Sequence, residues 1–236
     1  MAEKICMGLT DHNFQLASGE RVTAIAADDI PIDHLARYEF AVECLQDIQT
    51  PSGVLIGADI FCGSGYGSHI LAQQLPCFLL GIDGSSEAVQ RAAKHYTDLN
   101  LLFSHKFFPF YLTPCHFDFI VSMESIEHVE NGEMLFRIFA QALKPGGRLI
   151  ISAPNAEVVD LAKNPYHWHH RHYARHELVE LGRRNGLDHL RCAGTDCTII
   201  NTSGKVVAAN YHSPVSGKMR DDHPGDTLVH LFIKQM

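Results

Sequence analysis

The sequence predicts an α/β fold with a doubly wound, mostly parallel sheet and helices on both faces. Two patterns predict this class. Apolar runs of strand length alternate along the chain with longer amphipathic segments, which is the order of parallel strands joined by right-handed helical crossovers. A glycine-rich turn also joins the first strong apolar run, Val54 to Phe61, to a helical segment, as at the mouth of a nucleotide site.

The composition fits one domain over residues 1–236. Hydrophobic residues make up 46% of the chain, enough for a substantial core, and no run approaches the roughly 18–20 apolar residues of a membrane span. The first residues lack the pattern of a signal peptide, so we expect a cytoplasmic protein. The formal charge of −8 argues against a large nucleic-acid footprint. The seven cysteines include no C-x-x-C pair, which disfavours a disulfide framework or a zinc ribbon.

Residues 1–50 are predicted to hold an N-terminal arm and the first helix. Residues 1–21 are polar with weak periodicity, and a short strand is predicted near Val22–Ala26. A helix from Ile32 to Ile48 follows, because its apolar residues fall three and four positions apart on one face. These residues are Leu35, Tyr38, Val42, Leu45 and Ile48.

The segments up to Phe103 predict three strands and two helices. Pro76 ends the first of these helices, and Ser85 or Ser86 is expected to cap the second, with Glu87 in its first turn. The predicted strands are residues 54–61, 77–83 and 99–103, and the predicted helices are residues 68–75 and 86–96.

The second half of the chain continues the alternation and then departs from it. The turn Lys144–Gly147 stops a helix, residues 154–174 lack periodicity and are rich in histidine, and Gly, Ser, Thr and Pro fill a late excursion over residues 194–226. We expect a hairpin there, lying over the site. The predicted strands are 117–123, 148–153, 189–195 and 227–233, and the predicted helices are 132–143 and 175–185.

The glycine turn predicts a ligand site. Gly63, Gly65 and Gly67 alternate between the first core strand and the helix after it. Without side chains the backbone can approach a ligand closely, and the helix start presents unpaired N–H groups. The alternative is an ordinary tight turn between a strand and a helix.

Asp83 strengthens the prediction of a nucleotide site. It ends the second core strand, 20 residues after Gly63. A carboxylate at this point can accept hydrogen bonds from both hydroxyls of a ribose. The alternative is a plain helix-start acid, since Gly84 and Ser85 follow.

With these motifs the chain resembles class I S-adenosylmethionine-dependent methyltransferases over roughly residues 32–190. The resemblance rests on four motifs in the family's order: Asp-Ile-Phe-Cys-Gly-Ser-Gly-Tyr-Gly-Ser from Asp59, Gly-Ile-Asp ending at Asp83, Phe-Asp-Phe-Ile-Val-Ser-Met-Glu-Ser-Ile-Glu-His-Val from Phe117, and Leu-Lys-Pro-Gly-Gly from Leu143. It implies a seven-stranded sheet of the Rossmann-like methyltransferase type with one strand inserted antiparallel. It also implies S-adenosylmethionine as cofactor and S-adenosylhomocysteine as product.

The resemblance assigns cofactor-binding residues. The motif from Asp59 would hold the methionine end, Asp83 the ribose, and the end of the fourth strand would line the cofactor, while Arg37 is a candidate to cover the methionine carboxylate. The full set is Asp59, Phe61, Gly63, Ser64, Gly65, Tyr66, Gly67, Asp83, Gly84, Ser85, Ser122, Met123, Glu124 and Arg37.

The adenine site departs from the family's pattern. Many relatives carry an acid after the third strand that binds the adenine amino group. Here the segment reads Phe-Ser-His-Lys-Phe-Phe-Pro, without an acid. We expect backbone groups to bind adenine, stacked against Phe107 or Phe108.

Glu124-Ser-Ile-Glu127-His128 follows the fourth strand, at the carboxyl edge where open sheets bind ligands. The pattern resembles one associated with a divalent metal in ubiquinone-pathway O-methyltransferases and small-RNA 2′-O-methyltransferases. Two carboxylates and an imidazole would suit Mg²⁺ or Mn²⁺, which would lower the pKa of an acceptor hydroxyl. The alternative is a metal-free loop in which His128 is the catalytic general base.

The stretch from Tyr166 to His176 carries further candidate ligands. In the metal-using relatives a histidine downstream of the fifth strand completes the site, and His167, His169 and His170 all qualify here. The alternative is a substrate-facing loop with solvated histidines.

Together these features predict an enzyme that moves a methyl group by in-line displacement to a small-molecule, sugar or lipid acceptor, expected to react through a hydroxyl oxygen. Nucleic acid is not the expected acceptor because of the negative charge. Two alternatives remain: an NAD(P)-dependent oxidoreductase, and a cofactor-binding pseudo-enzyme or regulator on the same fold.

Overall fold

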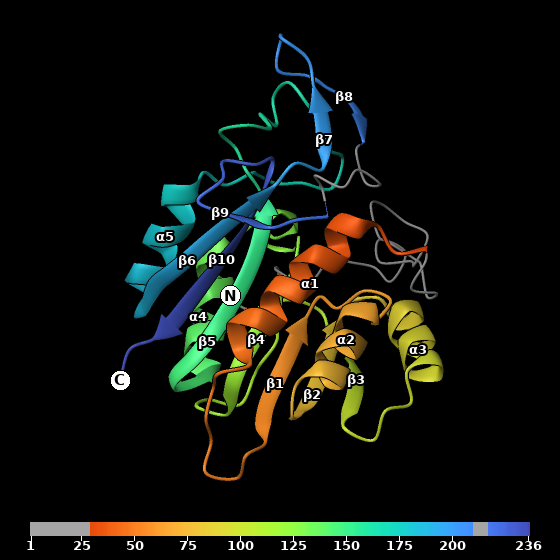
Figure 1. Ribbon diagram of the computed structural model, residues 1–236, viewed down its shortest axis with the longest axis vertical. Coiled ribbons are helices and arrows are strands. Elements are labelled where there is room, and N and C mark those ends of the chain that lie inside the picture. The colour runs from red at the N-terminus through yellow and green to blue at the C-terminus, as the bar shows by residue number, and fades with distance from the viewer. Residues whose placement is uncertain (1–28, 210–216) are drawn as a thin grey trace, which may run out of the picture.

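A mostly parallel sheet forms the centre of the molecule (Figure 1). The structure is a computed structural model that describes residues 29–209 and 217–236. Within these residues the sheet has the strand order β3-β2-β1-β4-β5-β10-β6-β9, and its first five strands run parallel. They are β1 (Leu55–Ile60), β2 (Cys77–Asp83), β3 (Leu101–His105), β4 (Phe117–Ser122) and β5 (Leu143–Pro154).

The inserted antiparallel strand is confirmed, but the number of strands is not. Strand β10 (Thr227–Lys234) lies antiparallel between β5 and β6 (Leu187–Thr195). The sheet has eight strands rather than the predicted seven, because β9 (Arg220–Asp221) pairs with the end of β6. Two polar residues carry no apolar alternation, so this short edge strand leaves no pattern in the sequence.

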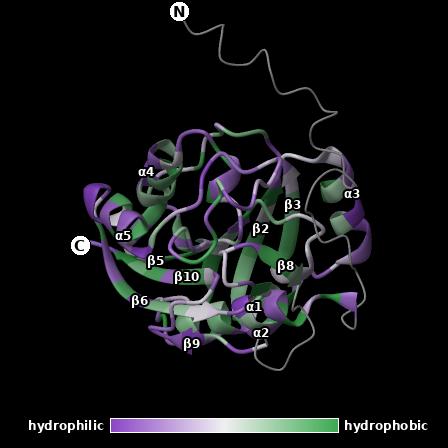
Figure 2. Cartoon of the chain, turned by 90° about the horizontal axis from the view of Figure 1, so that it is seen from above, coloured by the Kyte–Doolittle hydropathy of each residue, from purple (hydrophilic) through white to green (hydrophobic). Residues whose placement is uncertain are grey.

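Helices cover both faces of the sheet, as predicted. Figure 2 shows α1 (Ile32–Leu45) and α2 (Tyr66–Gln74) on one side of the strands and α4 (Gly132–Ala142) on the other. Apolar residues of these helices belong to the two hydrophobic cores. Helix α3 (Ser86–His95) packs beside β3, and α5 (Arg175–Arg184) packs beside β6. No helix among the described residues is both long and apolar enough to span a bilayer.

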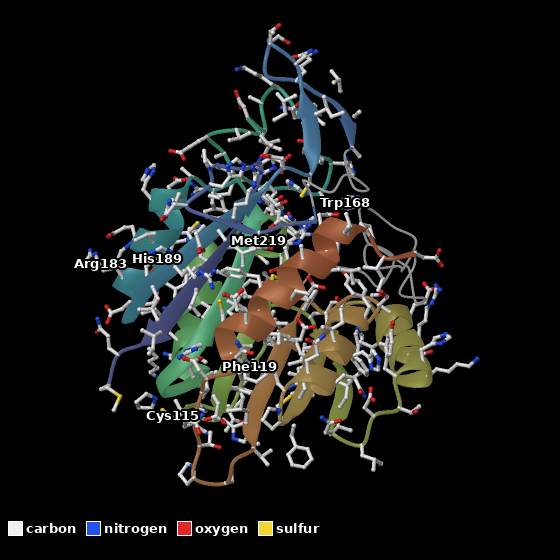
Figure 3. All side chains as sticks on the ribbon, viewed as in Figure 1. Cys115, Phe119, Trp168, Arg183, His189 and Met219 are labelled. Atoms are coloured by element: carbon white, nitrogen blue, oxygen red, sulfur yellow. The ribbon has the colours of Figure 1, made fainter. Side chains whose placement is uncertain are left out.

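Alternating residues of the central strands pack into two separate hydrophobic cores. Phe119 and Val121 of β4 pack with α1 and α2, while Ile120 between them packs with α4 and α5. Phe119 therefore lies in the middle of the molecule (Figure 3). Burial on both faces explains why the central strands are apolar throughout.

Local signals set the ends of the elements. Ser85 caps α3 by accepting a hydrogen bond from Ala88 N at 3.1 Å, as predicted, and Asn131 caps α4. Helix α2 begins at Tyr66, two residues before the prediction, because Gly65 takes a left-handed conformation and starts it. The predicted turn Lys144–Gly147 is an irregularity inside β5, where the pairing with β4 shifts register. The predicted arm and the strand Val22–Ala26 lie outside the described residues.

The late excursion contains a hairpin. Strands β7 (Thr198–Ile200) and β8 (Val206–Ala209) pair antiparallel in a sheet of their own. Figure 1 shows this hairpin rising from the end of the molecule where the parallel strands terminate. It therefore stands at the edge where an open α/β sheet binds ligands.

Candidate active site

The predicted site residues gather at the carboxyl edge of the parallel strands. The glycine turn follows β1, Asp83 ends β2, and Glu124 to His128 follow β4. The histidine-rich loop reaches the same place after β5, since His170 N donates to Glu127 O at 2.7 Å. His128 Nδ1 also donates to the carbonyl oxygen of Trp168 at 3.1 Å, and Figure 3 labels Trp168 at this end of the molecule.

The three glycines of the turn serve different purposes. A Cβ on Gly65 would lie 2.7 Å from Ala92 Cβ, and one on Gly67 would lie 1.9 Å from Tyr38 Cζ, so both permit close packing. A Cβ on Gly63 would meet no atom of the described residues within 4 Å, and its φ is +55°. Gly63 therefore leaves bare backbone next to open space, which is the property a ligand cradle needs.

Asp83 ties this turn to the neighbouring strand. Its Oδ2 accepts from Gly63 N at 2.9 Å, and its Oδ1 accepts from Ser85 N at 2.8 Å. The carboxylate is thus fixed beside the bare backbone of Gly63. A carboxylate has about four acceptor positions, so these two bonds are compatible with a role toward ribose hydroxyls.

Asp59 lies beneath the turn and is fully buried. It accepts hydrogen bonds from Ser68 Oγ at 2.7 Å and from the Tyr38 hydroxyl at 3.3 Å. Burial raises the pKa of Asp59 to about 7, although the two hydroxyl donors act in the opposite direction. These bonds join α1 and α2 to β1, so the contacts of Asp59 hold the framework of the turn together.

Arg37 occupies a buried charge cluster between α1 and the end of β4. Arg37 Nη1 lies 3.2 Å from Asp33 Oδ2, and both side chains are buried. Burial alone would lower the pKa of Arg37, but Glu124 and Asp33 raise it, so the guanidinium stays charged. Among the described residues, Asp33 Oδ1 has no hydrogen-bond partner.

Glu124 belongs to this charge cluster. Its Oε1 accepts from Ser152 Oγ at 2.7 Å, and Ser152 Oγ in turn accepts from Glu124 N at 2.8 Å. Burial raises the pKa of Glu124, while Arg37 and Ser152 act in the opposite direction. The backbone is left-handed here, with a φ of +44°, which turns the chain out of β4.

Glu127, His128 and His169 form the arrangement best suited to hold a metal. One potential ligand atom from each lies within 4.8 Å of the other two. In the described part of the chain Glu124, His167 and His170 are not members of this group. Of the two carboxylates predicted as ligands, the group therefore keeps Glu127 and loses Glu124. Of the three candidate histidines downstream of β5, the geometry brings in His169.

The other predicted cofactor residues line or support the same edge. Ser64 and Met123 are buried, the Tyr66 hydroxyl and His34 Nδ1 are hydrogen-bonded at 2.6 Å, and His105 Nε2 donates to Gly84 O at 3.0 Å. Ser122 Oγ donates to Ile60 O at 3.2 Å, which fastens β4 to the start of the glycine turn.

The aromatic residues expected near adenine form two separate sets of ring contacts. Phe61, left-handed with a φ of +62°, packs against Phe108 and Phe110, with ring centroids 6.4 and 5.9 Å away. Phe107 instead meets the ring of His105 edge to face at 4.8 Å. Stacking of adenine on Phe107 or Phe108 stays a prediction.

Sequence reasoning missed several partners. Asp33 is four residues before Arg37 on a helix, a spacing at which side chains meet, so this signal was available. Ser152 and His172 gave no comparable signal, because each meets its partner only in the folded chain.

Comparisons with known proteins show the family of the chain. A family model described as a methyltransferase domain matches residues 43–191. Phosphoethanolamine N-methyltransferase 1 of Arabidopsis thaliana is 30% identical over 137 residues, which cover 53% of this chain and 26% of that enzyme. The ubiquinone biosynthesis O-methyltransferase of Aeromonas salmonicida is 27% identical over 187 residues, covering 70% of this chain and 78% of that enzyme. The chain thus spans about a quarter of the plant relative.

Solved structures share the fold. An S-adenosylmethionine dependent methyltransferase from Mesorhizobium loti aligns with a TM-score of 0.61, over 86% of this chain and 100% of that one, at 17% identity. A match at this identity shows the architecture.

Proposed function

Since the chain belongs to the class I S-adenosylmethionine-dependent methyltransferases, we propose that it transfers a methyl group to a hydroxyl oxygen of a small-molecule, sugar or lipid acceptor. The glycine turn and the Glu127–His128–His169 group divide the work. The first binds the methyl donor, and the second receives the acceptor. When bound, the donor supplies a sulfonium methyl group that a nucleophile can attack in line.

The residues at the glycine turn fit this donor. Gly63 offers bare backbone, Asp83 is fixed beside it for the ribose, and Arg37 lies ready for the methionine carboxylate. Asp33 Oδ1 has no partner among the described residues, which costs about 1–3 kcal/mol for a buried acceptor. An ammonium group bound beside Arg37 would satisfy that oxygen, so the cluster suits an amino-acid moiety.

The Glu127–His128–His169 group is the observation that supports oxygen as the acceptor atom. An unactivated hydroxyl is a weak nucleophile, and it needs a base or a metal to remove its proton. An amine with a free lone pair needs neither. A carboxylate and two imidazoles gathered at the carboxyl edge therefore suit a hydroxyl acceptor, with His128 as the base that takes its proton when no metal ion is bound.

The same group fits a divalent ion. Two imidazoles and one carboxylate suit Mn²⁺, Fe²⁺ or Zn²⁺ better than Mg²⁺, which prefers oxygen ligands. An ion held by these residues would lower the pKa of the acceptor hydroxyl. Glu127 is the buried member of the group, which makes its loss the most damaging.

A methyl-transfer assay tests the proposal. We would supply donor with a deuterated methyl group, screen phenols, sugars, lipids and amines, and locate the label in the product by mass spectrometry. The expected product carries the label on oxygen. Glu127→Gln should lower turnover at least about tenfold, whereas Glu130→Gln, an exposed acid nearby, should leave it unchanged.

The metal is tested in the same assay. EDTA should abolish transfer, and Mn²⁺ should restore it better than Mg²⁺. Full activity in EDTA would refute the metal and leave His128 as an unaided base. Label found only on nitrogen or carbon would refute the oxygen acceptor.

A further inference from the structure

His172 lies outside the Glu127–His128–His169 group but touches one of its members. We infer that His172 is a positioning residue: it holds the His169 ring in the tautomer whose Nε2 carries the lone pair. The role we give to that lone pair rests on the proposed function. The tautomer itself follows from the contacts of His172 alone.

His172 is held firmly in its loop. Only 6% of its surface is exposed, and its Nδ1 lies 2.6 Å from the carbonyl oxygen of Val159. The neighbouring backbone is pinned to the end of β5, because Tyr173 N donates to Pro154 O at 3.4 Å and Ala156 N donates to Tyr173 O at 3.1 Å. The ring of His172 is thus fixed on one side by main-chain bonds.

The hydrogen bonds determine where the protons lie. A carbonyl oxygen only accepts, so His172 Nδ1 must donate to Val159 O. A neutral His172 ring then has no proton on Nε2, which accepts from His169 Nδ1 at 2.8 Å. Because His169 donates from Nδ1, its own neutral ring carries the lone pair on Nε2.

Neighbouring rings keep His169 in this orientation. Tyr166 stacks on His169, with centroids 4.7 Å apart and planes 14° from parallel, and His128 meets it edge to face at 4.7 Å. His128 follows the same rule, since its Nδ1 donates to Trp168 O. Both neutral histidines therefore carry their lone pairs on Nε2, where each could bind a metal ion or accept a proton.

Two substitutions at His172 separate positioning from simple packing. In His172→Gln the amide oxygen can stand at the Nε2 position and accept from His169, but the bond to Val159 is lost. In His172→Asn the amide nitrogen can stand at the Nδ1 position and donate to Val159, but the acceptor for His169 is lost. Melting temperature and S-adenosylhomocysteine binding report whether each variant is folded.

The tautomer is read directly by nuclear magnetic resonance of ¹⁵N-labelled histidine rings at about pH 8, where neutral rings prevail. We expect the Nδ1–H form of His169 in the wild type and in His172→Gln, and a shift toward Nε2–H in His172→Asn. An unchanged His169 ring in a folded His172→Asn protein would overturn the inference. This readout holds even if no hydroxyl acceptor is found, so the two proposals fail separately.

Kinetics give the second readout. We expect His172→Asn to lower kcat about tenfold or more with little change in KM for the methyl donor, and His172→Gln to recover most of that loss. Equal activity of the two variants, or higher activity of His172→Asn, would also overturn the inference, because a purely structural role favours the variant that keeps the Val159 bond.

Discussion

Asp59 and Asp83 end neighbouring strands but lie in different environments. Asp59 is fully buried and receives its hydrogen bonds from the hydroxyls of Ser68 and Tyr38. Asp83 receives backbone N–H groups of Gly63 and Ser85, next to open space. The first carboxylate therefore supports the framework of the turn, and the second lies beside the proposed binding site of the methyl donor.

The raised pKa of Asp59 predicts a pH dependence of stability. Its pKa is about 7 in the folded chain and about 4 in an unfolded one. Between these values the folded state keeps a proton that the unfolded state has released. The contribution of Asp59 to the free energy of unfolding therefore falls by up to about 1.4 kcal/mol per pH unit as pH rises through this window.

Urea denaturation of the wild type and Asp59→Asn measures this effect. The variant should gain stability relative to the wild type as pH rises from about 4 to about 7. Burial lowers the pKa of His230 to about 3, which acts in the opposite sense, but it is present in both proteins and cancels. Asp47→Asn is the control of opposite sign, because a hydrogen bond from Arg148 lowers the pKa of Asp47. If the difference in the free energy of unfolding between the wild type and Asp59→Asn stayed constant from about pH 4 to about pH 7, the raised pKa of Asp59 would be contradicted.

Single residues show how far the sequence predicts the site. The sequence placed Asp83, the glycines, Glu127 and His128 at one edge of the sheet, and the structure brings them together there, because parallel topology puts these strand ends side by side. It did not separate Glu124 from Glu127, since only the folded chain shows which carboxylate oxygen lies close to both His128 and His169. Nor did it choose among the histidines, because that depends on how the loop folds back.

At the scale of elements, Asn164 joins the histidine-rich loop to the β7–β8 hairpin. Its Nδ2 donates to Gly204 O at 3.0 Å, and its Oδ1 accepts from Val206 N at 2.8 Å. The side chain also donates to Asp160 O within its own loop. These bonds join the histidine-rich loop to the β7–β8 hairpin, about forty residues further along the chain, and both segments lie beside the site.

Asn164→Ala should loosen both segments together. Hydrogen exchange is expected to accelerate at residues 156–172 and 198–209, while the central strands stay protected, because the lost bonds hold only these two segments. Asn100→Ala is the matched control, since Asn100 also donates twice to backbone carbonyls but at β2 and α2. Faster exchange confined to the hairpin would show that the loop is held independently.

The order of elements was predicted well, and their edges less well. Strand β2 has the predicted bounds, and all five helices lie within a few residues of prediction, because long periodic segments and caps leave clear signals. Strand β9 was missed, since its pairing depends on β6 rather than on its own two residues. The register shift in β5 was likewise not predicted, because it depends on how β5 pairs with β4.

At the scale of the whole molecule, the site is assembled from two parts of different origin. The glycine turn, Asp83 and the Glu127–His128–His169 group lie within residues 43–191, the segment that matches the family model, whereas Arg37 precedes that segment. The β7–β8 hairpin lies beyond that segment and reaches the site through Asn164. The surroundings of the proposed acceptor site thus include a region that the family model does not match.

The central claim is that the bare backbone at Gly63 binds the methyl donor. Gly63→Ala tests it with a closely matched control, Gly53→Ala. Both glycines have positive φ, and an added Cβ on either meets no atom within 4 Å in the part of the chain that the structure describes, so each variant should lose a similar stability of about 1–2 kcal/mol. Gly53, however, lies at the start of β1, at the opposite edge of the sheet.

Calorimetric titration with S-adenosylhomocysteine is the most direct measurement. The wild type and Gly53→Ala should bind with the same affinity, and Gly63→Ala should bind at least about tenfold more weakly, a difference of about 1.4 kcal/mol. NADH should produce no binding heat. Equal affinities for the two glycine variants, or binding of NADH in place of S-adenosylhomocysteine, would contradict the account.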